Sequence, residues 1–139
     1  MEFRRDISFE LEQRLREPRS FIQIVLGPRQ TGKTTAIRQA LKETGFPAHV
    51  FSADSPSAIS SEQLEVEWMQ ARALAQQGPA VLFIDEIQKA SGWSETVKRL
   101  WDEDSWDDLD LKVVLSGSSS LLLSAGVSES LMGRHEIIR

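Results

Sequence analysis

The sequence predicts an α/β fold with three layers, in which helices cover both faces of a central parallel sheet. Compact apolar runs rich in β-branched residues, typical of strands buried on both faces, alternate along the chain with segments of helical periodicity. Strands separated by helices favour parallel pairing through right-handed crossovers. The 139 residues are 40% hydrophobic and 27% charged, which suits one globular domain with a modest core.

The first three elements follow from the spacing of apolar residues. Residues 7–15 carry apolar side chains four positions apart and predict an amphipathic helix that ends before Pro18. Residues 21–26 form a continuous apolar run that stops at Gly27, as a buried strand would. After a loop, residues 36–41 present one apolar helix face. Strand, loop and helix therefore follow one another in order.

The rest of the chain repeats this alternation. The predicted elements are, in order, a strand at 48–51, a helix over 64–75, a strand at 80–84, a helix over 93–101 and a strand at 111–115. The acidic stretch at 102–110 is expected to form a loop. Residues 136–139 look like the opening of one more strand, and the chain stops there without a turn or cap. We therefore expect a fragment of a longer protein, truncated near its last strand.

Composition excludes several classes of protein. There is no cysteine, so disulfides and thiolate metal sites are excluded, and His49 and His135 are interpreted as structural residues. No apolar run is long enough to span a membrane and no signal sequence opens the chain, so a cytoplasmic protein is expected. The net charge of −5 argues against a protein whose whole surface binds nucleic acid.

Charge is unevenly distributed along the chain. Six acidic residues fall within the nine positions 102–110, whereas five arginines lie near the start: Arg4, Arg5, Arg14, Arg16 and Arg19. The arginines could contact phosphates or a partner, or they could simply form a solvated helix face.

One loop carries a phosphate-binding pattern. The residues from the end of the first strand are Gly27, Pro28, Arg29, Gln30, Thr31, Gly32, Lys33 and Thr34, followed by Thr35. Two glycines separated by four residues, followed by Lys and Thr, form a P-loop, in which backbone N–H groups and a helix N-terminus bind phosphates. Lys33 would then contact the β- and γ-phosphates, Thr34 would bind Mg²⁺, and Thr35 would approach the α-phosphate. Arg29 could approach a phosphate or point to solvent.

Two acids close the strand at 80–84. Asp85 and Glu86 stand where a Walker B element has its carboxylates, the first holding Mg²⁺ and the second orienting and deprotonating the attacking water. The same pair could also be a helix N-cap with a solvated neighbour. Together with the P-loop, the pair favours hydrolysis over phosphate transfer to a small acceptor.

These residues carry a resemblance to a known family. Besides the P-loop, the matching segments are residues 82–89 with Trp93, residues 115–119 and residues 129–134. The chain is similar to the AAA+-type ATPase domain of a large bacterial and archaeal family of uncharacterised ATP-binding proteins. The resemblance implies one AAA+-type ATP-binding domain over 1–139, with a helix and linker at 1–19 and the P-loop core at 20–139. It also implies a lid and a second, often nuclease-like, domain beyond this chain.

Further expectations come from the resemblance alone. The strand ending at Leu115 should lie between the P-loop strand and the strand ending at Asp85. Ser116 or Ser118 could act as the sensor of the γ-phosphate, or both could belong to a glycine turn with serine caps. Arg134 resembles the arginine finger that reaches a neighbouring subunit's nucleotide, which would imply a homo-oligomer, although a locally paired arginine is the alternative.

The predicted function is Mg²⁺-dependent ATP binding and hydrolysis by a P-loop domain that acts as a motor or switch for a partner domain. The chain lacks a guanine-reading Asn/Thr-Lys-x-Asp motif, which helps to favour adenine. The alternative is a nucleotide-gated module that binds DNA or protein and hydrolyses little ATP. A small-molecule kinase is disfavoured because Arg134 and Arg139 are the only arginines after Lys112. Trp93 and Trp101 are interpreted as core packing rather than as a platform for bases.

Overall fold

The fold was analysed in a computed structural model, which describes residues 2–27, 32–57, 59–118 and 130–139. The helices are α1 (Glu2–Arg16), α2 (Lys33–Thr44), α3 (Ser61–Leu74) and α4 (Trp93–Trp106), with short 3-10 helices η1 (Ala75–Gln77) and η2 (Ile87–Lys89). The strands are β1 (Ile22–Leu26), β2 (Ala48–Ser52), β3 (Ala80–Asp85), β4 (Leu111–Gly117) and β5 (His135–Ile138). Each predicted element that falls on described residues is present, with ends shifted by a few positions.

The five strands form one parallel sheet in the order β2-β3-β4-β1-β5. Strand β4 therefore lies between β1 and β3, which confirms the expected position of the strand ending at Leu115. Its neighbours are fixed in register by the pairs Leu26↔Gly117 and Ile84↔Leu115. As a result the carboxyl ends of β1, β3 and β4 meet at one edge of the sheet, which we call the carboxyl edge.

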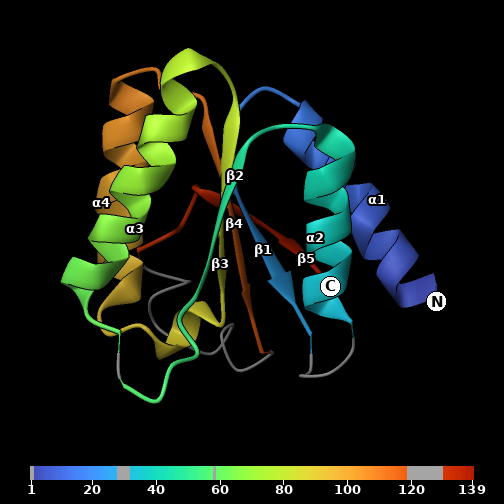
Figure 1. Ribbon diagram of the computed structural model, residues 1–139, viewed down its shortest axis with the longest axis horizontal. Helices are drawn as coiled ribbons and strands as arrows, with labels where there is room; N and C mark the ends of the chain where they lie inside the picture. The colour runs from blue at the N-terminus through green and yellow to red at the C-terminus, as the bar shows by residue number, and fades with distance from the viewer. Residues whose placement is uncertain (1, 28–31, 58, 119–129) are drawn as a thin grey trace.

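Helices cover both faces of the sheet, with α1 and α2 on one side and α3 and α4 on the other (Figure 1). Strand β1 serves both cores because its side chains alternate: Ile24 packs with the α3 and α4 residues Trp68 and Val97, whereas Val25 packs with α1 and α2. All five β1 residues are buried. The three-layer α/β/α prediction is confirmed.

Helix α1 is amphipathic as predicted and ends at Arg16, before Pro18. Ile7, Leu11 and Leu15 are at most 2% exposed and pack in the same core as the apolar face of α2. Among the helices within the described ranges, none is long and apolar enough to cross a lipid bilayer.

The prediction of a loop at 102–110 is wrong for its first half, because α4 continues to Trp106. Asp104 is 1% exposed, accepts a hydrogen bond from Trp68 Nε1 at 2.8 Å and pairs with Arg72, whose Nε lies 2.6 Å from Asp104 Oδ1. Both partners come from α3. Tertiary contacts of one buried acid therefore extend a helix that composition alone would end earlier.

Candidate functional site

The site begins where β1 and β4 end, at the carboxyl edge (Figure 1). The backbone N–H of Gly27 donates to the carbonyl of Gly117 at 3.3 Å, so the start of the P-loop is fixed to the end of β4. Gly32, at the other end of the loop, has φ 82° and ψ 12°, a left-handed conformation that favours glycine. The loop residues Pro28, Arg29, Gln30 and Thr31 lie outside the described residues.

Lys33 is the first residue of α2 and is only 5% exposed. Its ammonium donates to the carbonyls of Gly27 at 3.1 Å and Gly117 at 3.0 Å. The first turn of α2 contains no acidic residue that would offset the positive end of the helix dipole. The dipole and the Lys33 charge therefore add to one another. A buried cation at a helix N-terminus is an arrangement that attracts phosphate. The following threonines differ in exposure, Thr34 being half-buried and Thr35 exposed.

Asp85 ends β3 and is held from two sides. Its Oδ1 accepts a hydrogen bond of 2.5 Å from Ser116 Oγ, and its carbonyl accepts the N–H of Ala53 at 2.9 Å. Ser116 itself is fully buried. Ser116 therefore positions the carboxylate proposed for Mg²⁺, a contact that the sequence did not predict. Ser118, the other sensor candidate, is half-buried directly after β4.

Glu86 follows Asp85 in an unusual conformation, with φ 54° and ψ 48°. The left-handed region is sparsely populated by non-glycine residues and costs free energy, which is typical of functional sites. Its side chain is 8% exposed, and its Oε1 lies 3.9 Å from Lys33 Nζ. The alternative of a helix cap with a solvated neighbour does not fit, because Glu86 is buried and its side chain makes no capping hydrogen bond to η2.

Gln88 completes this group, since its Nε2 donates to Glu86 Oε2 at 2.7 Å. We call Lys33, Glu86 and Gln88 the Glu86 triad. The sequence singled out Gln88 as part of the family resemblance but assigned it no role. No spacing rule reveals the contact, because it depends on the left-handed turn at Glu86.

A metal ion at this edge would depend on few protein ligands. Thr34 and Asp85 are the residues that could hold Mg²⁺, and a carboxylate with a hydroxyl matches its preference for oxygen ligands completed by water and phosphate. In the described part of the chain no group of three or more His, Cys, Asp or Glu residues could form a metal cluster by itself. These two residues therefore suit a Mg²⁺ ion whose other ligands are water and the bound phosphates.

Arg134 is not brought to this site within its own chain. Its carbonyl accepts the N–H of Ile22 at 2.7 Å, which places it beside the beginning of β1, at the opposite end of the sheet, which we call the amino edge. Its guanidinium forms two hydrogen bonds with Asp102, at 2.8 and 2.9 Å, and these raise the pKa of Arg134. In this structure the arginine is paired locally.

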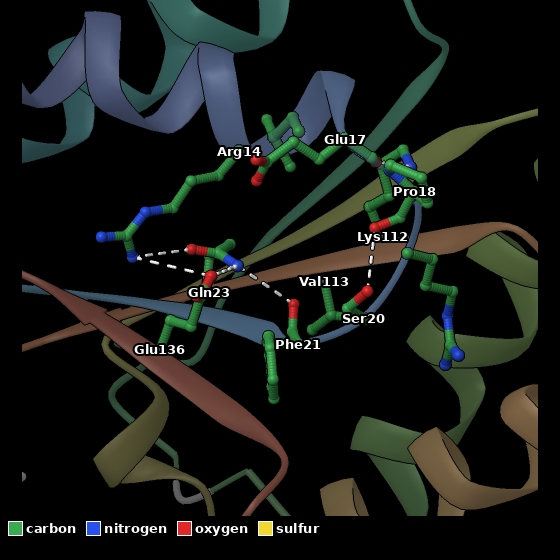
Figure 2. A pocket seen from close by; sticks show the side chains of 11 residues that line it. Arg14, Glu17, Pro18, Ser20, Phe21, Gln23, Lys112, Val113 and Glu136 are labelled. Atoms are coloured by element: carbon green, nitrogen blue, oxygen red, sulfur yellow. Dashed lines mark hydrogen bonds and ion pairs between the residues drawn. The ribbon is translucent and has the colours of Figure 1, made fainter.

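The amino edge holds a cavity of about 310 Å³ with a second polar group (Figure 2). Gln23 Nε2 donates to Glu136 Oε1 at 2.9 Å, and Arg14 Nη1 donates to Gln23 Oε1 at 3.1 Å while lying 3.9 Å from Glu136 Oε1. We call these three residues the Glu136 triad. Nearby, Lys112 Nζ donates to the carbonyl of Glu17 at 3.0 Å and to Asp110 Oδ1 at 3.2 Å.

The other residues considered in the sequence have structural partners. His49 Nε2 lies 2.7 Å from Glu67 Oε1, and His135 Nδ1 lies 2.7 Å from the carbonyl of Leu131. Both tryptophans at 93 and 101 are at most 7% exposed and belong to the core, as interpreted. Arg19 lies 3.6 Å from the centre of the Trp101 ring, and burial lowers the pKa of Arg19.

Comparison with known proteins agrees with this arrangement. The fold and site define an AAA+-type P-loop ATPase domain, and a model of the family described as AAA domain matches residues 19–139. The chain belongs to that family.

Individual relatives are similar at modest identity. The uncharacterized protein MJ1544 of Methanocaldococcus jannaschii is 29% identical over 115 residues, which are 82% of this chain and 25% of that protein. The structure of the Thermotoga maritima RuvB Holliday junction branch migration motor matches with a TM-score of 0.64 and 25% identity, covering 99% of this chain and 43% of RuvB. A variant of the same RuvB matches with a TM-score of 0.61 and 26% identity, again covering 99% of this chain and 43% of that one. This chain therefore spans about a quarter of the length of MJ1544.

Proposed function

We propose that this domain binds ATP with Mg²⁺ and hydrolyses it, and that it serves as a motor or switch for a partner domain. The observation that carries the proposal is the convergence of Lys33, Asp85 and Glu86 at the carboxyl edge. A buried ammonium on the P-loop lies 3.9 Å from one carboxylate, and the other is fixed by a serine on the strand between them. Membership of the AAA domain family supports the same chemistry.

Each residue has a distinct role in the proposal. The backbone of residues 27–33 binds the phosphates, and Lys33 neutralises the β- and γ-phosphate charge. Thr34 and Asp85 hold Mg²⁺, which supplies charge neutralisation on the phosphates when bound. Glu86 orients the attacking water and accepts its proton. Thr35 and Ser118 complete the nucleotide contacts.

The test separates binding from turnover. In Glu86→Gln the side chain keeps its size but loses its basicity, so Mg²⁺-dependent binding of a non-hydrolysable ATP analogue should persist in calorimetry. Turnover should fall by about a hundredfold or more. Glu136→Gln at the amino edge is the matched control, because that glutamate also accepts a hydrogen bond from a glutamine. A Glu86→Gln protein that hydrolyses ATP at the full rate would show that Glu86 is not the base.

We also propose that Arg134 acts on the nucleotide of a neighbouring subunit. Arg134→Ala and Glu86→Gln proteins should each be nearly inactive alone, yet regain activity when mixed, because a mixed interface can combine an intact Glu86 with an intact Arg134. Asp102→Ala removes the local partner of Arg134 and should keep turnover. Mixed proteins that stay inactive, despite forming oligomers, would contradict the role in trans.

The second candidate is a nucleotide-gated binding module that hydrolyses little ATP. The observation in its favour is the ion pair between Arg134 and Asp102, which engages the proposed finger within its own chain. Because RuvB is described as a branch migration motor, DNA is one ligand to add to the turnover assay. ATP-dependent retention of DNA or of a protein partner, with turnover unchanged by Arg134→Ala, would favour this candidate.

A further inference from the structure

The Glu86 carboxylate lies between two donors of different kinds. The Gln88 amide donates to Oε2 at 2.7 Å, and the Lys33 ammonium lies 3.9 Å from Oε1. The ammonium also has its own acceptors, the carbonyls of Gly27 and Gly117. The amide therefore makes the shorter contact with the carboxylate.

Gln88 is a poor choice for stability at this position. Its Oε1 atom is buried and accepts no hydrogen bond from the residues that the structure describes. Burying an acceptor without a partner costs free energy, and such atoms in native proteins require an explanation. The neighbouring Glu86 adds the cost of a left-handed backbone. Two local costs, two residues apart, are explained if the orientation of the Glu86 carboxylate is what this turn supplies.

The turn around Gln88 is attached to the rest of the domain through both of its neighbours in sequence. Ile87 is fully buried in the core, and Lys89 donates its N–H to the carbonyl of Glu86 at 3.0 Å. The Lys89 ammonium also pairs with Asp54 Oδ1 at 3.0 Å, which ties η2 to the segment after β2. Gln88 is thus held on both sides, so its amide can impose a direction on the carboxylate.

We propose that Gln88 is a positioning residue that holds the Glu86 carboxylate in the direction needed for hydrolysis. The inference rests on the proposed function, since it takes Glu86 as the base. When Lys33 turns its charge toward bound phosphate, the amide of Gln88 keeps the carboxylate in place. Gln88 itself touches neither the water nor the phosphate in this proposal.

The test replaces the amide without changing the length of the side chain. In Gln88→Met the maximal turnover rate kcat should fall by about tenfold to a hundredfold, because the base is no longer aligned with the attacking water. The KM for ATP and the Kd of a non-hydrolysable analogue should stay within about threefold, a split that a general loss of structure would not give. Gln88→Leu, which is also uncharged and also removes the donor, should behave alike and serves if the methionine variant folds poorly.

Gln23→Met is the matched control, because Gln23 holds Glu136 through the same kind of amide contact. It should lower thermal stability and leave kcat per folded protein unchanged. A double-mutant cycle completes the design: in a Glu86→Gln background the Gln88→Met change should have no further effect on the residual rate, because it acts only through that carboxylate.

The outcomes distinguish the two proposals. If Glu86→Gln stops turnover while Gln88→Met keeps full kcat, the positioning role is overturned and the proposed function stands. A Gln88→Met effect of equal size in the Glu86→Gln background would also overturn it. If the protein shows no turnover, or Glu86→Gln keeps it all, the base assignment and the positioning role both fail.

Discussion

Each of the two edges of the sheet carries a group of three residues, consisting of a glutamate, a glutamine and a cation. The Glu86 triad and the Glu136 triad differ in their surroundings. At each edge a glutamate accepts a hydrogen bond from a glutamine Nε2, at 2.7 Å for Glu86 and 2.9 Å for Glu136. In each case a cation lies 3.9 Å from the carboxylate, Lys33 at one edge and Arg14 at the other. The amino edge also has a cavity of about 310 Å³ (Figure 2).

The differences lie in burial, strain and satisfaction of hydrogen bonds. Glu86 is 8% exposed with a left-handed backbone, whereas Glu136 is 40% exposed on a regular strand. Gln88 has a buried Oε1 without a partner among the described residues, whereas Gln23 Oε1 accepts from Arg14. The amino edge is thus arranged as a stabilising network, whereas the carboxyl edge carries two local costs that the proposed catalytic role of Glu86 would explain.

The largest effect is expected when each edge loses its buried lysine. Lys33 and Lys112 are 5% and 7% exposed, so their substitutions compare the two edges directly. Lys33→Ala should weaken binding of an ATP analogue by at least about a hundredfold, since charge-assisted hydrogen bonds to phosphate are lost. Lys112→Ala should keep its affinity for the ATP analogue. Its thermal stability should fall about as much as that of Lys33→Ala. Calorimetric titration of both variants measures the difference, and equal loss of binding would break the contrast.

The second prediction concerns stability near the amino edge, where the last turns of α4 lie: Asp102 pairs there with Arg134, and Asp104 follows two residues later. Asp104→Ala removes the acceptor of Trp68 Nε1 and one counter-charge of the half-buried Arg72, which keeps its ion pair with Glu103. We expect the free energy of unfolding to fall by about 2 kcal/mol, the order found when a buried hydrogen-bond donor is left without its acceptor. Denaturant titration measures this, with Glu62→Ala on the exposed face of α3 as the control. Nucleotide affinity of the folded Asp104→Ala protein should be unchanged; a matching loss of affinity would link the two edges.

The parts of the fold that the sequence predicted are those set by local pattern. The strands over 21–26 and 80–84 are continuous apolar runs bounded by glycine, proline or acids, so their position and burial followed directly. The order of strands needed the family resemblance. The helical character of residues 102–106 was missed, because Asp104 is held by α3 residues far away in sequence.

For the candidate site, too, the sequence predicted only what local motifs encode. The motif spacing indicated Lys33 and Asp85, and the structure brings Lys33 within 3.9 Å of Glu86. The partners of the two carboxylates, Ser116 and Gln88, were not predictable, since each contact depends on backbone geometry that spacing does not encode. Motifs specify which groups react, whereas tertiary contacts specify how they are oriented.

The smallest expected effect is a pH dependence at the amino edge. Burial raises the pKa of Asp104, against the opposing influence of the Trp68 hydrogen bond and the charges of Arg72 and Arg19. A carboxyl group with a raised pKa in the folded state binds its proton more tightly there than in the unfolded chain. Its contribution to stability is therefore complete below the unfolded pKa of about 3.9, and is lost as the pH rises through the folded pKa.

Asp104→Asn tests this sign, because the amide does not titrate. The loss of unfolding free energy caused by the substitution should be larger at about pH 3.5 than at about pH 7, since wild-type protein gains from the protonated carboxyl only in acid. Urea titration of both proteins across this range measures the difference, and groups shared by the two proteins cancel. A loss that instead grows with pH would mean that the Arg72 charge outweighs burial. The amino edge would then depend on a buried charge. The contrast with the carboxyl edge would rest on the backbone strain at Glu86 and on the Gln88 Oε1 atom, which has no partner within the described part of the chain.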